Sequence, residues 1–184
     1  MIDSYSYREK YDLPKMIFLG TNDEFWTVDA IKNYIGGIPG ETYTSYVTNA
    51  GHGLGEEAFI SLEAFFHQTI HGKEYPRLDY KIKEKARKMS LDFQADKGML
   101  EDVVVWEAYS NDKDFRPKKF ESSRLGISAK AKFSVDVAYP EKGFKAFMVM
   151  LKYKHPTIPG ATYNITTRMF TASPDELFEE VFVP

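Results

Sequence analysis

Residues 15–26 read KMIFLGTNDEFW, and residues 42–53 read TYTSYVTNAGHG. In the first stretch an apolar run stops at Gly20 and a polar turn follows, which is typical of a buried strand and its exit. The second stretch is rich in aromatic and β-branched residues up to Val47, so it predicts another strand. A histidine between two glycines then follows, where glycine lets the backbone turn sharply and leaves the imidazole unobstructed.

Two helices are expected to alternate with these strands. The first begins after Thr27, a suitable cap, and ends at Gly36-Gly37. Its apolar residues recur at helical spacing: Val28, Ile31, Tyr34 and Ile35. The second covers residues 56–71 and stops at Gly72. Its apolar face is formed by Phe59, Leu62, Phe66 and Ile70. The order strand–helix–strand–helix favours two parallel strands joined by crossover helices.

The rest of the chain has the two-residue period of half-buried strands. In AKAKFSVDVAY (129–139) every odd position is apolar, and the positions between them are polar as far as Asp136. Further β-prone runs occupy residues 89–95, 102–109, 144–153 and 163–172. An antiparallel β-sandwich of roughly seven strands, similar to immunoglobulin or fibronectin type III domains, is the expected architecture.

Charge and composition support a division near Tyr75-Pro76. Residues 1–76 carry 5 basic and 11 acidic residues, whereas residues 77–184 carry 19 and 16. We therefore expect two domains with these bounds. The balance of 43% hydrophobic and 28% charged residues is that of a globular protein. A net charge of −3 does not favour nucleic acid as a partner, and no apolar run reaches the roughly 18 residues of a membrane span.

Asp23 and His52 are the principal candidates for chemistry. Each follows the carboxyl end of one predicted parallel strand, and ligands of open parallel sheets bind at that edge. If the strands are neighbours, the carboxylate could orient the imidazole as a general base. The alternative is a turn aspartate and a loop histidine without contact. Three other acids remain open as partners: Asp12, Asp29 and Glu24.

Other signals are weaker. His67 and His71 share one helix face, but Gln68 stands where a zincin motif has its glutamate, so we expect no metal site. The chain contains no cysteine and no G-x-S-x-G motif. An acid and a base are therefore present without an evident nucleophile, and no cofactor-binding motif is evident.

With these residues in hand, the chain resembles the C-terminal part of PhoPQ-activated pathogenicity-related proteins. The resemblance rests on LPKMIFLGTND (13–23), NAGHG (49–53) and VVVWEAYSNDKDFR (103–116), and it extends to EKGFKAFMVMLKY (141–153). It implies an α/β-hydrolase-like segment, the last two parallel strands with their helices, followed by an appended β-sandwich. It also implies that Asp23 is the acid and His52 the base of a Ser-Asp-His triad.

The resemblance places the serine upstream of the acid, in a segment that this chain does not contain. We therefore expect a C-terminal portion of a serine hydrolase acting on small-molecule or peptide esters or amides, inactive by itself. The alternative is a non-catalytic secreted module that binds or signals through its β-sandwich. Self-association through the exposed α/β edge is expected because strands that would cover it are lacking. Family resemblance suggests export to the periplasm or the extracellular space.

Overall fold

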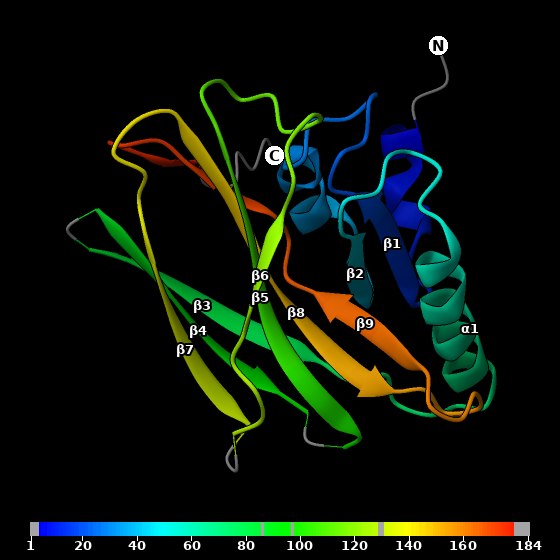
Figure 1. The fold of residues 1–184 in the computed structure, drawn as a ribbon. Coiled ribbons are helices and arrows are strands. Elements are labelled where there is room, and N and C mark those ends of the chain that lie inside the picture. The colour runs from blue at the N-terminus through cyan, green and yellow to red at the C-terminus, as the bar shows by residue number, and fades with distance from the viewer. Residues whose placement is uncertain (1–3, 86, 97, 129–130, 179–184) are drawn as a thin grey trace.

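The computed structural model describes residues 4–178 except 86, 97 and 129–130 (Figure 1). The protein is mostly β, with 41% strand and 17% helix. A large mixed sheet of eight strands runs through the molecule, and a separate sheet of three strands packs against part of it. A single α-helix and several short 3₁₀ helices complete the described part of the chain.

The large sheet has the order β1-β2-β9-β8-β10-β11, and β5 pairs with β8 and β6. Its strands are β1 (Lys15–Gly20), β2 (Thr42–Val47), β5 (Leu100–Ser110), β6 (Glu121–Arg124), β8 (Phe144–Lys154), β9 (Thr162–Thr166), β10 (Phe170–Ala172) and β11 (Leu177–Phe178). Within the described residues, β1 and β2 run parallel, and the other strand pairs of this sheet are antiparallel. The long β5–β8 ladder forms the centre of the sheet.

The small sheet contains β3 (Leu78–Lys85), β4 (Lys88–Ala95) and β7 (Lys132–Ala138), all antiparallel. Apolar side chains of β4 alternate inward, as the sequence indicated, and Met89 and Leu91 are fully buried. They meet Phe147 and Leu151 of β8 in the main core. Each such burial contributes roughly 1.5–3 kcal/mol, so this contact is a major source of stability.

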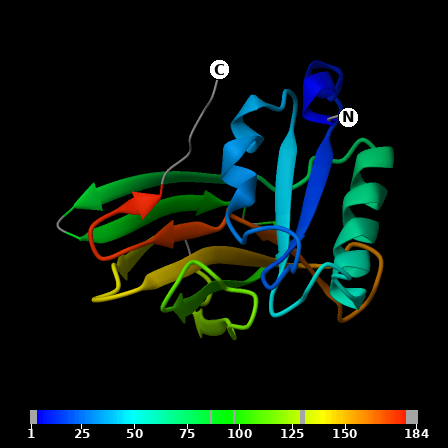
Figure 2. The same ribbon diagram turned by 90° about the horizontal axis from the view of Figure 1, so that it is seen from above.

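The opposite face of the large sheet has its own core. It is covered by the segment that contains η2 (Ala30–Asn33) and η3 (Ile35–Gly37), and by the loop after β5. Ile31, Phe120 and Met148 are completely enclosed there. Figure 2 shows this segment on one side of the β1–β2 pair and α1 (Glu56–Ile70) beyond β1. The first 3₁₀ helix, η1 (Ser4–Lys10), precedes β1.

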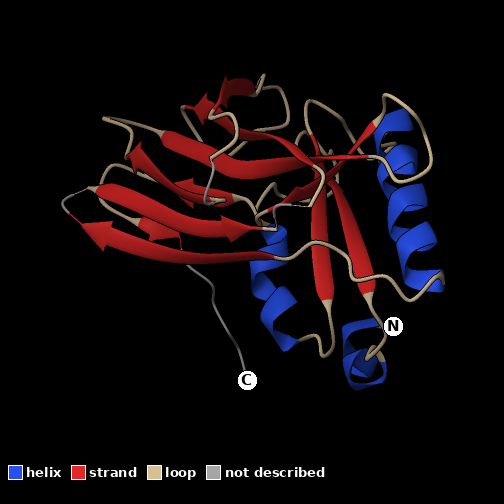
Figure 3. Cartoon of the chain, turned by 90° about the horizontal axis from the view of Figure 1, so that it is seen from below, coloured by secondary structure: helices blue, strands red, loops and turns tan. Residues whose placement is uncertain are grey.

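The expected fold class is wrong. The parallel pair is present, but it is not a partial α/β-hydrolase segment: β2 is hydrogen-bonded on its other side to β9, so one mixed sheet joins the two halves of the chain (Figure 3). Thr44 donates its hydroxyl to the carbonyl of Thr166 at 2.6 Å, and the Tyr46 amide donates to the Thr166 hydroxyl at 3.2 Å. The crossover between β1 and β2 is made of 3₁₀ turns rather than an α-helix.

The expected immunoglobulin-like sandwich fits only in part. Three strands form the second layer, and they cover one part of the large sheet, while α1 covers another part of the same face. Local periodicity located most strands, but it carries no information about which distant strand each one joins. A division into two domains near residue 76 therefore stays a prediction.

The predicted face of α1 is reversed. Four of its large apolar residues point away from the sheet, with 69% exposure for Phe59, 44% for Leu62, 62% for Phe66 and 59% for Ile70. We call these four residues the α1 stripe. Small and polar residues face the sheet instead: Ala58, Ser61, Ala64 and Gln68. Small side chains allow close approach of the helix to β9.

Polar contacts fix α1 in this orientation. The backbone N–H of Asn164 donates to the Ser61 hydroxyl at 3.1 Å, and the side-chain amide of Gln68 donates to the Tyr163 hydroxyl at 3.3 Å. The side chain of Asn164, a residue that is 3% exposed, also donates to Glu57. Because buried polar groups need partners, these bonds favour the polar face of α1 against the sheet.

His155 connects α1 to the β8–β9 loop. Its ring is completely buried and its Nε2 lies 3.0 Å from the carbonyl oxygen of Ile60 and 2.9 Å from Glu63. Its Nδ1 accepts the backbone N–H groups of Thr157 and Ile158, at 3.3 and 3.0 Å. No helix in the described residues combines the length and apolar character needed to cross a membrane.

Candidate functional site

The parallel register of β1 and β2 brings their carboxyl ends together. Gly20 pairs with Val47, so the turn after β1 and the loop after β2 start from adjacent positions. A Cβ at Gly20 would lie 2.5 Å from the carbonyl oxygens of Ala50 and Gly51. Only glycine permits this approach without a backbone shift. The two loops that carry the candidate acid and base are therefore in direct contact.

Asp23 and His52 are hydrogen-bonded. The His52 Nδ1 lies 2.9 Å from Asp23 Oδ2, while Asp23 Oδ1 accepts the backbone N–H groups of Phe25 and Trp26 at 2.8 and 3.2 Å. The Asp23 side chain is 10% exposed and that of His52 is 55% exposed. The turn after β1 thus holds the carboxylate rigidly and leaves the imidazole open to a ligand.

Burial and hydrogen bonding together determine the protonation of the Asp23–His52 pair. Burial alone would raise the pKa of Asp23, but the Phe25 N–H, the His52 ring and the Trp26 N–H together bring it below its ordinary value of 3.8. Asp23 is therefore ionised at neutral pH and can only accept hydrogen bonds. A neutral His52 ring must then carry its proton on Nδ1, which leaves the Nε2 lone pair available as a base. No hydrogen bond to Nε2 is made within the described residues.

Neighbouring groups position His52. Glu24 Oε2 accepts the backbone N–H of His52 at 3.1 Å, so this rival acid holds the main chain rather than the ring. A Cβ at Gly51 would lie 2.8 Å from that same oxygen, whereas a Cβ at Gly53 would meet nothing within 4 Å. Of the two flanking glycines, Gly51 has the closer surroundings, and a side chain there would have to displace the end of the Glu24 side chain. The Phe25 ring packs edge-on against the imidazole at 5.0 Å.

Sequence reasoning missed two asparagines that hold a third loop against the site. The Asn22 side chain donates to the carbonyls of Phe115 and Lys118. Asn49 exchanges two hydrogen bonds with the backbone of Phe120, at 2.7 and 3.1 Å. Asn22 directly precedes Asp23, and Asn49 lies three residues before His52. These positions were the sequence signal for their role. The GTND, NAGHG and DFR segments thereby form one cluster.

The other candidates lie apart from this pair. The Asp29 carboxylate accepts Lys32 at 2.6 Å and Thr171 at 2.7 Å, which attaches the η2 segment to β10. Asp12 is exposed before β1, at the wrong end of the strand. His71 Nδ1 bonds to the carbonyl oxygen of His67, and the described residues contain no group of three potential metal ligands. A zinc site at these two histidines has no third ligand there.

An apolar hollow of about 470 Å³ adjoins the pair. It is lined by Asp23 and His52, by Trp26 and Leu54, and by consecutive residues 17–20 of β1. Residues of η1 and of the segment that contains η2 also line it, among them Tyr5 and Tyr34. The base therefore lies beside an apolar space large enough for a small ligand or an extended chain segment.

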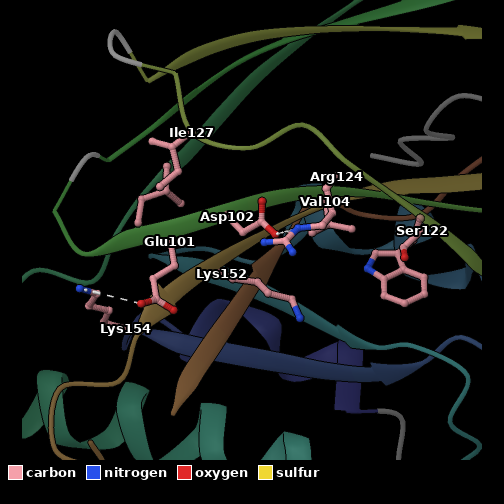
Figure 4. A pocket seen from close by; sticks show the side chains of 10 residues that line it. Glu101, Asp102, Val104, Ser122, Arg124, Ile127, Lys152 and Lys154 are labelled. Atoms are coloured by element: carbon pink, nitrogen blue, oxygen red, sulfur yellow. Dashed lines mark hydrogen bonds and ion pairs between the residues drawn. The ribbon is translucent and has the colours of Figure 1, made fainter. Parts of the chain in front are cut away.

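A second hollow, of about 510 Å³, lies elsewhere, over β5, β6 and β8 (Figure 4). At its floor, Arg124 Nε donates to buried Asp102 at 2.6 Å. Glu101 lies 3.9 Å from Lys154. Lys152 makes no ion pair within the described part of the chain, so one positive charge of the lining remains uncompensated. This hollow is polar, in contrast to the one beside His52.

Fold and site together define a β-rich protein with a hydrogen-bonded aspartate–histidine pair at the carboxyl ends of two parallel strands. The family model described as PhoPQ-activated pathogenicity-related protein matches residues 1–116, which is more than half of the chain. The protein therefore belongs to the PhoPQ-activated pathogenicity-related family. The matched range contains both parallel strands, the Asp23–His52 pair and Phe115.

Two further comparisons add little. The search of curated proteins returned no match. Among solved structures, the solution structure of R. palustris CsgH is similar at 8% identity, with 55% of this chain and 94% of that chain covered and a TM-score of 0.26. A similarity at that level does not establish a common fold.

Proposed function

We propose that this chain supplies the acid and base of a Ser-Asp-His triad that hydrolyses esters or amides. The 2.9 Å contact between Asp23 and His52 supports this proposal most directly. The lowered pKa of Asp23 and the exposed imidazole are what a general base and its orienting carboxylate need. No hydrogen bond to His52 Nε2 is made within the described residues, and we place the nucleophilic serine in a segment outside them.

The chemistry follows from this geometry. The serine Oγ attacks the substrate carbonyl while His52 Nε2 accepts the hydroxyl proton, and Asp23 stabilises the resulting imidazolium. His52 then returns the proton to the leaving alcohol or amine as the tetrahedral intermediate collapses to an acyl-enzyme. Water then attacks the acyl carbon while His52 takes its proton, and His52 returns that proton to the serine Oγ as the acid is released. Donors for the oxyanion are also required, and we assign none.

A serine-reactive fluorophosphonate probe tests the proposal. The 184-residue chain by itself is expected to remain unlabelled. In the complete polypeptide that contains these residues, stoichiometric labelling is expected, and His52→Ala should slow it at least 100-fold because serine loses its base. The exposed His71→Ala is the matched control and should label at the normal rate. Labelling of the 184-residue chain, or normal labelling of His52→Ala, would contradict the proposal.

A second candidate function is binding without catalysis. The polar hollow with uncompensated Lys152 favours it, since that site could hold a small anion away from the aspartate–histidine pair. The coding sequence upstream of Met1 discriminates between the candidates. A G-x-S-x-G motif there supports the hydrolase, and a coding region without such a serine favours the binding module.

We also propose that the chain self-associates through the open edge of β1. β1 ends the large sheet, and unpaired edges readily accept another strand.

A further inference from the structure

One buried hydroxyl joins the two loops that carry the acid and the base. Thr21, the first residue after β1, is only 1% exposed. Its Oγ1 accepts the backbone N–H of Asn49 at 2.7 Å and donates to the side-chain oxygen of Asn22 at 2.8 Å. A hydroxyl has one proton to donate and lone pairs that accept, so both bonds form together. The Thr21 hydroxyl thus bonds to the turn of Asp23 on one side and to the loop of His52 on the other.

A third loop determines the direction of these bonds. The Asn22 side-chain nitrogen lies 3.0 Å from the carbonyl oxygens of both Phe115 and Arg116. Because carbonyls only accept, the amide must direct its N–H groups toward that loop and its oxygen toward Thr21. The Thr21 hydroxyl must then direct its only proton at Asn22, which leaves its lone pairs for the Asn49 N–H. Each group in this series of bonds therefore has a defined orientation.

Asn49 closes the network into a ring. Its side-chain oxygen accepts the N–H of Phe120 and its side-chain nitrogen donates to the Phe120 carbonyl. Its backbone lies in the left-handed region, with φ 57°, which asparagine adopts more readily than most residues. Phe115 and Phe120 are both buried in the core that contains Met148 of β8. The ring thereby connects the acid turn and the base loop to the core of the large sheet.

Thr21 supplies the shielded link between the two loops. The bond from the His52 N–H to Glu24 is exposed, so water can replace either partner. The Asn22 N–H also donates to the Ala50 carbonyl, at 3.0 Å, and both residues are partly exposed. Loss of the Thr21 hydroxyl would instead leave hydrogen-bonding groups unmet where water has little access, which costs more than loss of an exposed bond.

We propose that Thr21 is a positioning residue for the acid–base pair. Acting through Asn22 and Asn49, it holds the two loops at the separation at which His52 Nδ1 reaches Asp23, at 2.9 Å. The tautomer of a neutral imidazole depends on the hydrogen bond that each ring nitrogen makes. When the loops separate, the carboxylate no longer holds the proton on Nδ1, and a form with the proton on Nε2 becomes populated. That form has no lone pair on Nε2 to act as a base.

This inference rests on the proposed role of His52 as a general base, but the tautomer can be measured without the serine. Long-range ¹H–¹⁵N NMR of the ring nitrogens makes that measurement on the 184-residue chain, at a pH where the imidazole is neutral. The signals that disappear in His52→Ala identify His52. In the unmodified chain its proton is expected on Nδ1.

Thr21→Val keeps the shape of the side chain and removes the hydroxyl. It is expected to shift the larger part of the His52 population to the form with its proton on Nε2. Thr21→Ser, the matched conservative variant, keeps the hydroxyl and should restore the form with the proton on Nδ1. Circular dichroism verifies that each variant is folded.

His155 is an internal reference in the same spectrum. Its Nδ1 accepts two backbone N–H groups, so its proton lies on Nε2, opposite to the arrangement expected for His52. Its other partners belong to α1 rather than to the Thr21 network. The His155 signals should therefore be the same in every variant, and only those of His52 should change.

Asn49→Gly reaches the network from the other loop. Glycine adopts the φ of 57° without strain, so this variant removes the bonds to Phe120 and should shift the His52 tautomer in the same direction as Thr21→Val. In the complete polypeptide, labelling by the fluorophosphonate probe should slow about tenfold or more for Thr21→Val, because a small misplacement of the base lowers the rate steeply. Thr21→Ser should recover most of that rate.

Three results would overturn the proposal: a His52 proton that stays on Nδ1 in folded Thr21→Val, equal tautomer shifts in Thr21→Val and Thr21→Ser, or a change in His155 that accompanies the change in His52. The last would indicate a general loss of structure. Should Thr21→Val not fold, an unchanged His52 tautomer in Asn49→Gly overturns the proposal. An unlabelled complete polypeptide would contradict the hydrolase proposal alone, because the tautomer does not depend on the serine.

Discussion

Asp23→Asn in the complete polypeptide is expected to lower kcat about 10⁴-fold with little change in KM. An amide in place of the carboxylate can donate to the ring, which favours the tautomer with its proton on Nε2, so the base is lost. Asparagine is nearly isosteric and its oxygen can still accept the Phe25 and Trp26 N–H groups. The turn after β1 should therefore survive, and steady-state kinetics on a p-nitrophenyl ester measures the loss.

Glu24→Gln is the matched control for this substitution. Its carboxylate accepts only the His52 backbone N–H, so the amide should retain that bond and reduce kcat less than tenfold. Equal losses of kcat in both variants would contradict the assignment of Asp23 as the acid.

Because the pKa of Asp23 is lowered, its pairing with His52 is complete above pH 3.8 and is lost only as the pH falls through the lower folded-state value.

His155→Ala is expected to lower the free energy of unfolding by about 3–5 kcal/mol. It leaves the Ile60 carbonyl and the N–H groups of Thr157 and Ile158 without their buried partner, at about 1–3 kcal/mol for each group that water cannot reach. It also opens a cavity under α1. Urea denaturation of the two proteins at pH 7 measures the difference.

His71→Ala serves as the control, because His71 is exposed and bonds only within its own turn. Its effect should stay within about 0.5 kcal/mol. Hydrogen exchange adds a structural readout: amides of α1 should lose protection in His155→Ala before those of β5 and β8 do. A stability loss below 1 kcal/mol would show that His155 does not hold α1 in place.

The contact between Asp23 and His52 was predictable because it depends on local signals. An apolar run that stops at Gly20 and a β-rich run that stops before NAGHG fix where two strands end, and parallel pairing brings such ends together. The contact is confirmed at 2.9 Å, and the catalytic role stays a prediction. The strand β4 was predictable for the same reason, since its alternation matches its burial, but its partners in the small sheet were not.

The pairing of β2 with β9 could not be read from either strand. It joins Thr44 to Thr166, which are 122 positions apart, and threonine is equally suited to many strand positions. The predicted orientation of α1 was wrong for another reason. Helical periodicity finds a face rich in large apolar residues, but small residues of α1 lie against the sheet, and of its phenylalanines only Phe65 packs against the main core.

The burial of Asn164 beneath α1 bears on how the protein should be produced. Residues 164–166 read Asn-Ile-Thr, an acceptor sequence for N-linked glycans, and the Asn164 side-chain nitrogen is the atom that donates to Glu57. A eukaryotic secretory host could attach a glycan to the nascent chain before α1 docks. The sugar would then occupy the space of the helix. A bacterial host that does not attach such glycans would keep that position free of carbohydrate.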